Sequence, residues 1–128
     1  MSHGKALVVR VEDRPGTLGE IASALGAHGV NLRALEGSTE SGQGVVRMVV
    51  DKLADAKRVL LERGYSPEEE EVLEFELSDD PGALGEAAEA LGEAGVNIKY
   101  VFVTTAGAKK ATAFLAVSDI KKALKALW

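Results

Sequence analysis

The chain contains the same short sequences twice, and this internal repeat constrains its fold more than any other feature. Its only two asparagines, Asn31 and Asn97, each stand in the sequence Gly-Val-Asn and lie 66 residues apart. The same separation relates the two Asp-x-Pro-Gly sequences that begin at Asp13 and Asp79. A constant separation without a gap is typical of a duplicated structural unit. The sequence therefore predicts one small module written twice, with both motifs at equivalent places.

The length of 128 residues suits one domain or two very small ones. We place the first repeat at residues 1–71 and the second at residues 72–128. A unit of about 60 residues buries only about 60% of its unfolded surface, so it is marginally stable alone. The two repeats are therefore expected to pack together or against another chain.

Composition excludes several classes of protein. No apolar run of about 18 residues is present, which predicts no membrane span. The N-terminus lacks the apolar core of a signal peptide, so we expect a cytoplasmic protein. The chain has no cysteine, and neither His3 nor His28 has a neighbour at metal-ligand spacing, so we expect no metal site and no cofactor.

The formal net charge of −5 argues against nucleic acid as a partner. The densest basic cluster, which is Lys121, Lys122 and Lys125, is read as a solvated helix face. A phosphate-binding surface needs a denser positive stripe with aromatic side chains between the cations.

Hydrophobic periodicity predicts the same order of elements in both copies. In the first copy we expect strands at residues 6–11, 32–36 and 45–51, a final strand at 65–71, and helices after Pro15 and at 54–63. In the second copy we expect strands at 72–77, 98–104 and 111–117, and helices after Pro81 and at 119–128. The helix after Pro15 has an apolar stripe of Leu18, Ile21, Ala22 and Leu25. The helix after Pro81 has the equivalent stripe of Leu84, Ala87, Ala88 and Leu91. The order predicts an α+β fold of ferredoxin-like (βαββαβ) repeats with an antiparallel sheet and helices on one face.

The second copy has no counterpart of the strand at 65–71. In a ferredoxin-like sheet this strand lies beside the first one, so the strand at 72–77 is expected to present an unpaired edge. Because such an edge is a template for another strand, we predict a homodimer joined through it.

The turn between the first strand and the first helix has the chemistry of a small binding site. Pro15 suits the first helical position, and Gly16 lets a ligand approach the backbone closely. The helix N-terminus offers free N–H groups to a carboxylate, and Asp13 can bind a cation. Asn31 adds one donor and one acceptor. These groups together match a zwitterionic amino acid.

A purely structural interpretation of the same residues has equal weight at this point. Pro-Gly after a strand also serves as an ordinary helix-start turn, and an asparagine after Gly-Val can cap backbone groups. Catalysis is not indicated, because no serine or threonine has a histidine partner. The carboxylates of Asp79 and Asp80 are a local pair, and Gly37, Gly42 and Gly44 lie in a hairpin without a following helix, so no phosphate loop is predicted.

Both copies resemble the ACT domain, the small regulatory module of amino-acid metabolism. The resemblance rests on Val-Glu-Asp-Arg-Pro-Gly-Thr-Leu-Gly-Glu with Gly-Val-Asn-Leu, and on Leu-Ser-Asp-Asp-Pro-Gly-Ala-Leu-Gly-Glu with Gly-Val-Asn-Ile. It implies two ACT repeats side by side in one continuous antiparallel sheet, the second lacking its last strand. It also implies two crossed ligand sites, in which the first loop faces Asn97 and the second loop faces Asn31. The loop residues are Asp13, Arg14, Pro15, Gly16, Thr17 and Leu18 in the first copy, and Asp79, Asp80, Pro81, Gly82, Ala83 and Leu84 in the second.

The two loops differ at the residue before the proline. Asp80 stands where the first copy has Arg14, and a carboxylate at the N-cap can bond the helix N–H groups itself and repel a ligand carboxylate. The first loop is therefore expected to be the stronger anion site.

The leading hypothesis is a non-enzymatic amino-acid sensor that controls an enzyme of amino-acid metabolism, with a biosynthetic enzyme as its partner. The alternative is an ACT module without a ligand that acts as a regulatory subunit or oligomer scaffold. A small metal- or nucleotide-handling enzyme is disfavoured because no such site is predicted. The sequence does not identify the amino acid.

Overall fold

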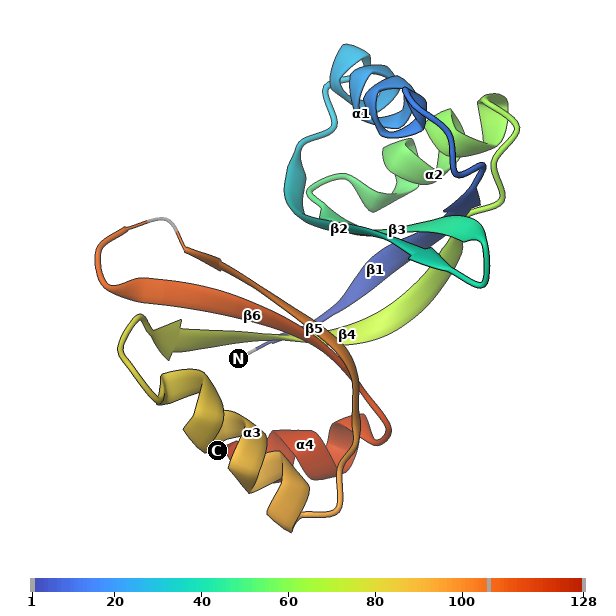
Figure 1. Cartoon of the computed structure of the whole chain (residues 1–128). Helices are drawn as coiled ribbons and strands as arrows, with labels where there is room; N and C mark the ends of the chain where they lie inside the picture. Colours follow the sequence, from blue (N-terminus) through green and yellow to red (C-terminus); the bar gives the residue numbers. More distant parts are fainter. Residues whose placement is uncertain (1, 106, 128) are drawn as a thin grey trace. The chain divides into compact units, whose positions relative to one another are not determined.

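The computed structural model of the protein describes residues 2–105 and 107–127. These residues form the strands and helices that are labelled in Figure 1. In chain order these are β1 (Ser2–Val11), α1 (Thr17–Ala27), β2 (Leu32–Glu40), β3 (Gln43–Val50), α2 (Leu53–Glu62), β4 (Glu68–Ser78), α3 (Ala83–Glu93), β5 (Ile98–Thr105), β6 (Lys110–Val117) and α4 (Ile120–Leu127). The predicted α+β class with ferredoxin-like repeats is confirmed. Trp128, which was predicted to end the last helix, lies outside the described residues.

The strands form an antiparallel sheet with the order β2-β3-β1-β4-β6-β5. The predicted strands at 65–71 and 72–77 are one continuous strand, β4, which begins at Glu68. β4 is hydrogen-bonded to β1 on one side and to β6 on the other. Only residues 2–4 of β1 join this part of the chain, so an open edge along the rest of residues 72–77 stays a prediction.

The neighbour of β4 in the second repeat comes from the first residues of β1. The contacts divide the chain into one unit of residues 5–70 and a second unit of residues 71–127 together with residues 2–4. His3 Nε2 lies 3.6 Å from Glu71 Oε1 within the second unit. Residues 68–70 play the corresponding part in the first unit, and they stand 66 positions after residues 2–4. β1 therefore begins at Ser2, before its predicted start at residue 6, because the polar or glycine residues 2–4 have no hydrophobic pattern that indicates a strand.

In the first unit, α1 and α2 cover one face of β1, β2 and β3 (Figure 1). Helix α1 buries Thr17, Ile21, Ala24 and Leu25. The prediction that Leu18 faces the core is wrong, since its side chain is 45% exposed. The buried core of this unit consists of Leu7, Val9, Val11, Ile21, Ala24, Leu25, Val30, Val46, Met48, Val50, Ala56, Val59 and Leu60.

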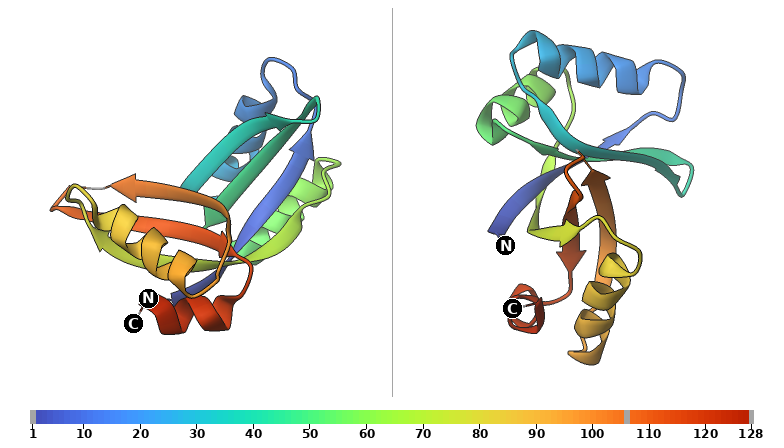
Figure 2. Two further views of the ribbon diagram at one scale, coloured as in Figure 1. Left: turned by 60° about the horizontal axis from the view of Figure 1, so that its bottom comes forward. Right: turned by 90° about the vertical axis from the view of Figure 1, so that its left-hand side faces the viewer.

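In the second unit, α3 and α4 pack against β4 and β6 (Figure 2). Its core has smaller side chains at equivalent places, with Ala87 where the first unit has Ile21. Leu84, the counterpart of Leu18, is also exposed, at 40%. The buried core of this unit consists of Leu73, Leu77, Ala87, Leu91, Val96, Ala111, Ala113, Leu115, Val117 and Ala123.

Both motif helices begin after a turn that only glycine fits well. Gly16 has φ 92° and ψ −13°, and Gly82 has φ 86° and ψ −9°. With proline before a left-handed glycine, this is the geometry of a type II turn. In the second repeat the Ala83 N–H donates to the Asp80 carbonyl at 3.2 Å and closes the turn. Pro15 therefore precedes the helix, and its predicted place at the first helical position is wrong.

Candidate functional site

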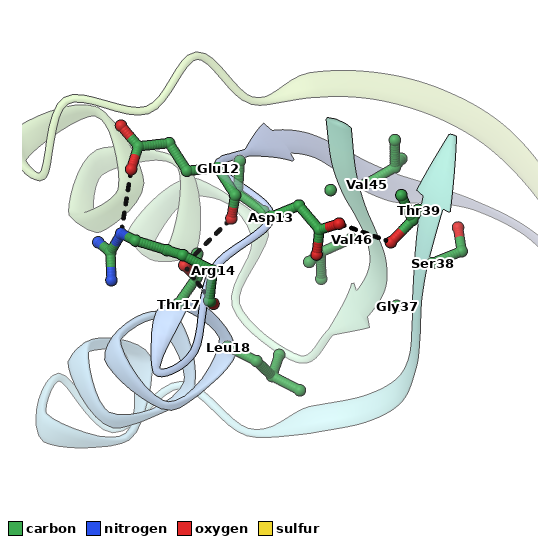
Figure 3. Close-up of a pocket in the computed structure, with 12 residues that line it drawn as sticks. Glu12, Asp13, Arg14, Thr17, Leu18, Gly37, Ser38, Thr39, Val45 and Val46 are labelled. Carbon is green, nitrogen blue, oxygen red and sulfur yellow. Dashed lines mark hydrogen bonds and ion pairs between the residues drawn. The ribbon is translucent and has the colours of Figure 1, made fainter. Parts of the chain in front are cut away.

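A cavity of about 260 Å³ opens beside the loop between β1 and α1 (Figure 3). Its walls come from this loop, from the first turn of α1 and from the middle of β2 and the start of β3. It lies entirely within the first unit. The lining residues are Val11, Glu12, Asp13, Arg14, Thr17, Leu18, Gly37, Ser38, Thr39, Gly44, Val45 and Val46.

Asp13 points across the cavity toward β2 (Figure 3). Its Oδ2 accepts a hydrogen bond of 3.3 Å from the Thr39 hydroxyl. This long bond joins two exposed groups, so an incoming ammonium group can replace it at small cost. The exposed carboxylate is the anionic group that a ligand cation would contact.

Arg14 points away from Asp13, toward Glu12 (Figure 3). Its Nε donates to Glu12 at 3.0 Å, and its Nη atoms donate to Glu20 at 3.1 and 3.3 Å. Glu20, and then Glu12, raise the pKa of Arg14, so the guanidinium stays charged. Because these ion pairs are exposed to solvent, they hold the side chain only weakly.

The first turn of α1 closes the cavity with one buried polar residue and one exposed apolar residue. Thr17 is 4% exposed. Its hydroxyl lies 3.2 Å from the carbonyl oxygens of both Glu12 and Arg14, and it donates a hydrogen bond that these two acceptors share. This bond ties the loop to the helix. Leu18 extends toward the strand that carries Gly37 (Figure 3).

The predicted loop residues share the cavity with strand residues for which the sequence predicted no role. Gly37, Ser38 and Thr39 were placed in a strand or hairpin without a role, yet they form the wall opposite Asp13. Gly44 allows close packing, because a Cβ there would lie 2.7 Å from Val11 Cγ2. Gly37 is different, since a Cβ there would meet no heavy atom within 4 Å.

The two asparagines take equivalent structural positions at the start of β2 and β5. The Asn31 N–H donates to Asp51 Oδ1 at 2.9 Å, and the Asp51 N–H donates to the Asn31 carbonyl at 3.2 Å. Asn97 makes the same pair of bonds with Ser118, both at 2.9 Å. Asn31 does not line the cavity beside Asp13. The crossed pairing of each loop with the other repeat's asparagine stays a prediction.

The loop of the second repeat has another arrangement. Among the described residues no side chain caps α1 or α3, so the prediction that Asp80 caps its own helix is wrong. The physical reason is the turn at Gly82, which moves the helix start two residues beyond Asp80. The Asp79 N–H instead donates to the Lys109 carbonyl in the β5–β6 turn at 2.8 Å. Pro81 and Gly82 form the turn itself, and Ala83 lines a groove beside β4.

No group of three or more His, Cys, Asp or Glu side chains in residues 2–105 and 107–127 could hold a metal ion. Within the same residues, no helix has the length and apolar character needed to cross a membrane.

Residues 5–61 match the model of the ACT domain family. This part of the chain is an ACT domain. The match covers the loop, α1, β2 and β3, and so it includes the whole cavity. The second repeat has the same motifs and the same order of elements, so the chain consists of two ferredoxin-like repeats, of which the first matches the ACT domain family.

Solved structures of similar fold span nearly the whole chain. A protein from Bacteroides thetaiotaomicron is 25% identical, with a TM-score of 0.89 over 98% of this chain and 86% of that one. The ligand-free regulatory subunit of aspartate kinase from Thermus thermophilus is 15% identical, with a TM-score of 0.72 over 99% and 89%. The corresponding subunit from Thermus flavus is also 15% identical, with a TM-score of 0.62 over 99% and 91%. No curated protein sequence matches the chain.

Proposed function

We propose that this ACT protein is a non-enzymatic regulator that binds a small amino acid and controls an enzyme of amino-acid metabolism in the cytoplasm. The observation that carries the proposal is the cavity between the Asp13 carboxylate and the N-terminus of α1. The regulatory subunits of similar fold give it further support.

The ligand chemistry follows from the two ends of the cavity. Asp13 and Thr39 offer oxygen acceptors to an ammonium group. The first N–H groups of α1 have no partner within the helix, and the helix dipole adds positive potential to attract a carboxylate. Arg14 also lines the cavity, and its guanidinium would reach the same carboxylate only by leaving its exposed glutamates. These groups favour a zwitterion over a simple anion or cation.

The size of the cavity favours a small side chain. About 260 Å³ lies just below the usual range of ligand pockets, which begins near 300 Å³. Val11, Val46 and Leu18 supply the apolar part of the wall, and Ser38 supplies a hydroxyl. We therefore propose glycine, alanine or serine as the class of ligand.

A thermal-shift screen against the twenty amino acids is the first test. A ligand at ~100 times its dissociation constant stabilises the folded state by about 2.7 kcal/mol, which raises the melting temperature visibly. We expect small amino acids to raise the melting temperature of the native protein. Asp13→Asn should abolish this increase, and the matched variant Asp79→Asn should keep it. If no amino acid shifts the melting temperature, the alternative of a regulatory subunit without a ligand is favoured.

We also propose that the protein is a homodimer, joined through a strand other than the one predicted from sequence. β5 ends the strand order of the sheet, and its Val101 and Val103 are 38% and 37% exposed. Such an edge can pair with a second copy. Light scattering at micromolar concentration is expected to give the mass of a dimer. Val101→Lys should give a monomer and Val101→Thr should not, whereas a monomeric native protein would contradict the proposal.

A further inference from the structure

We infer that only the first repeat has an open ligand cavity, that Gly37 keeps it open, and that the second repeat has become a fixed structural element. The ligand part of this inference rests on the function proposed above. Its structural part, the difference between the two loops, stands on the contacts of each repeat separately.

Strand pairing gives the exact counterparts of the cavity residues. Ala34 pairs with Val49 in the first repeat and Tyr100 pairs with Ala116 in the second, each beside the same irregularity in β2 or β5. The separation is therefore 66 residues before the hairpin and 67 after it. Gly37 corresponds to Val103 by the same register, since they pair with Val46 and Ala113 respectively.

Val103 occupies the space that Gly37 leaves empty. Directly paired residues lie on the same face of a sheet. Val46 and Ala113 both belong to the helix-side cores, so Gly37 and Val103 face the helices of their own units. The wall opposite the loop thus has no side chain in the first repeat and an isopropyl group in the second.

The two loops are also anchored by bonds of different kinds. The first loop reaches β2 through the side-chain bond of 3.3 Å between Asp13 and Thr39. The second loop is tied to its hairpin by the shorter backbone bond of 2.8 Å from Asp79 to Lys109. A ligand ammonium can replace the side-chain donor at Asp13. The backbone bond of Asp79 fixes the position of the second loop without engaging the Asp79 carboxylate, so the exclusion of a ligand there depends on the wall opposite and on the other loop residues.

Two further exchanges remove ligand chemistry from the second repeat. Asp80 replaces the cation of Arg14, and Ala83 replaces the hydroxyl of Thr17. The cavity of about 440 Å³ that adjoins this loop is lined by Glu76, Leu77, Ser78, Asp80 and the turn at residues 108–110. The counterparts of Leu18, Gly37 and Thr39 do not line it.

Hydrogen exchange and calorimetry together test the inference. In the unliganded protein, the Asp79 amide should exchange at least about tenfold more slowly than the Asp13 amide, because it is bonded to a backbone carbonyl. Titration with glycine, L-alanine and L-serine should give one site per chain. Gly37→Val should weaken that site by about tenfold or more. It should leave the melting temperature nearly unchanged, since the position has room and lies in a strand.

The matched variant Val103→Gly should leave the binding of these probes unchanged. Two equal sites per chain, or undiminished binding by Gly37→Val, would overturn the inference. If the native protein binds none of the probes, the proposed function fails, and the exchange experiment alone decides the difference between the loops. Equal protection of Asp13 and Asp79 then overturns the inference as well.

Discussion

Ile21→Ala is expected to lower the free energy of unfolding by about 2–5 kcal/mol, the usual cost of truncating a large aliphatic side chain in a core. Ile21 is 1% exposed and packs among the core residues of the first unit. Because small domains are stable by only about 5–15 kcal/mol, this loss is a large part of the total. Urea unfolding followed by circular dichroism measures it.

The second repeat supplies the matched control for this variant. Ala87 stands at the equivalent position and lines an open groove of about 320 Å³ together with Phe75 and Leu127. Ala87→Ile is therefore expected to fill space and to raise stability by about 0.5–2 kcal/mol. A loss from Ala87→Ile comparable to that from Ile21→Ala would show that the two helix faces are packed equally, contrary to the structure.

Asp13→Ala is expected to weaken the binding of a small amino acid by about 10- to 100-fold. The substitution removes the carboxylate that receives the ligand ammonium, and hydrogen bonds to charged groups contribute about 1.5–3 kcal/mol, where 1.4 kcal/mol is tenfold. Asp13 is exposed, and its side chain accepts one hydrogen bond from Thr39 among the residues that the structure describes, so the fold should be little affected. Isothermal calorimetry measures the affinity.

Asp79→Ala is the natural control, because it changes the same motif in the other repeat. It should leave the affinity nearly unchanged, since the Asp79 bond to Lys109 comes from the backbone. Equal losses from the two substitutions would mean that both loops bind ligand. An unchanged affinity in Asp13→Ala would mean that the ligand cation lies elsewhere.

The repeat itself made most of the fold predictable. Hydrophobic periodicity and the duplicated turn motifs located the elements of both copies, because each helix and strand depends mainly on local pattern. The start of β1 was missed where the pattern gave no information. Residues 2–4 are polar or glycine, and their place in a strand depends on long-range pairing with another segment.

The candidate site was predictable in its loop and not in its strand wall. Asp13, Arg14, Thr17 and Leu18 were found because the turn motif implies free N–H groups beside a carboxylate. Gly37 and Thr39 approach the loop only through the register of β2 with β3, which a single sequence does not specify. Comparing the copies position by position could have identified Gly37, since Val103 stands in its place.

The starts of α1 and α3 differ from the predictions because of local backbone geometry. The prediction for Asp80 assumed that the residue before proline is the N-cap. The positive φ of Gly82 instead ends the turn and begins the helix, so the aspartate lies outside capping distance along the chain. Leu18 and Leu84 are 45% and 40% exposed, so the buried apolar stripe of each helix begins later than the sequence pattern predicted.

The most direct test of amino-acid binding by the first repeat is a titration of isotopically labelled protein with L-serine, followed by amide NMR. The expected result is saturable shifts of the amides of residues 13–18 and 37–39, with the amides of residues 79–84 unmoved. Saturable shifts confined to residues 79–84, or no saturable shift in either loop with any small amino acid, would contradict it.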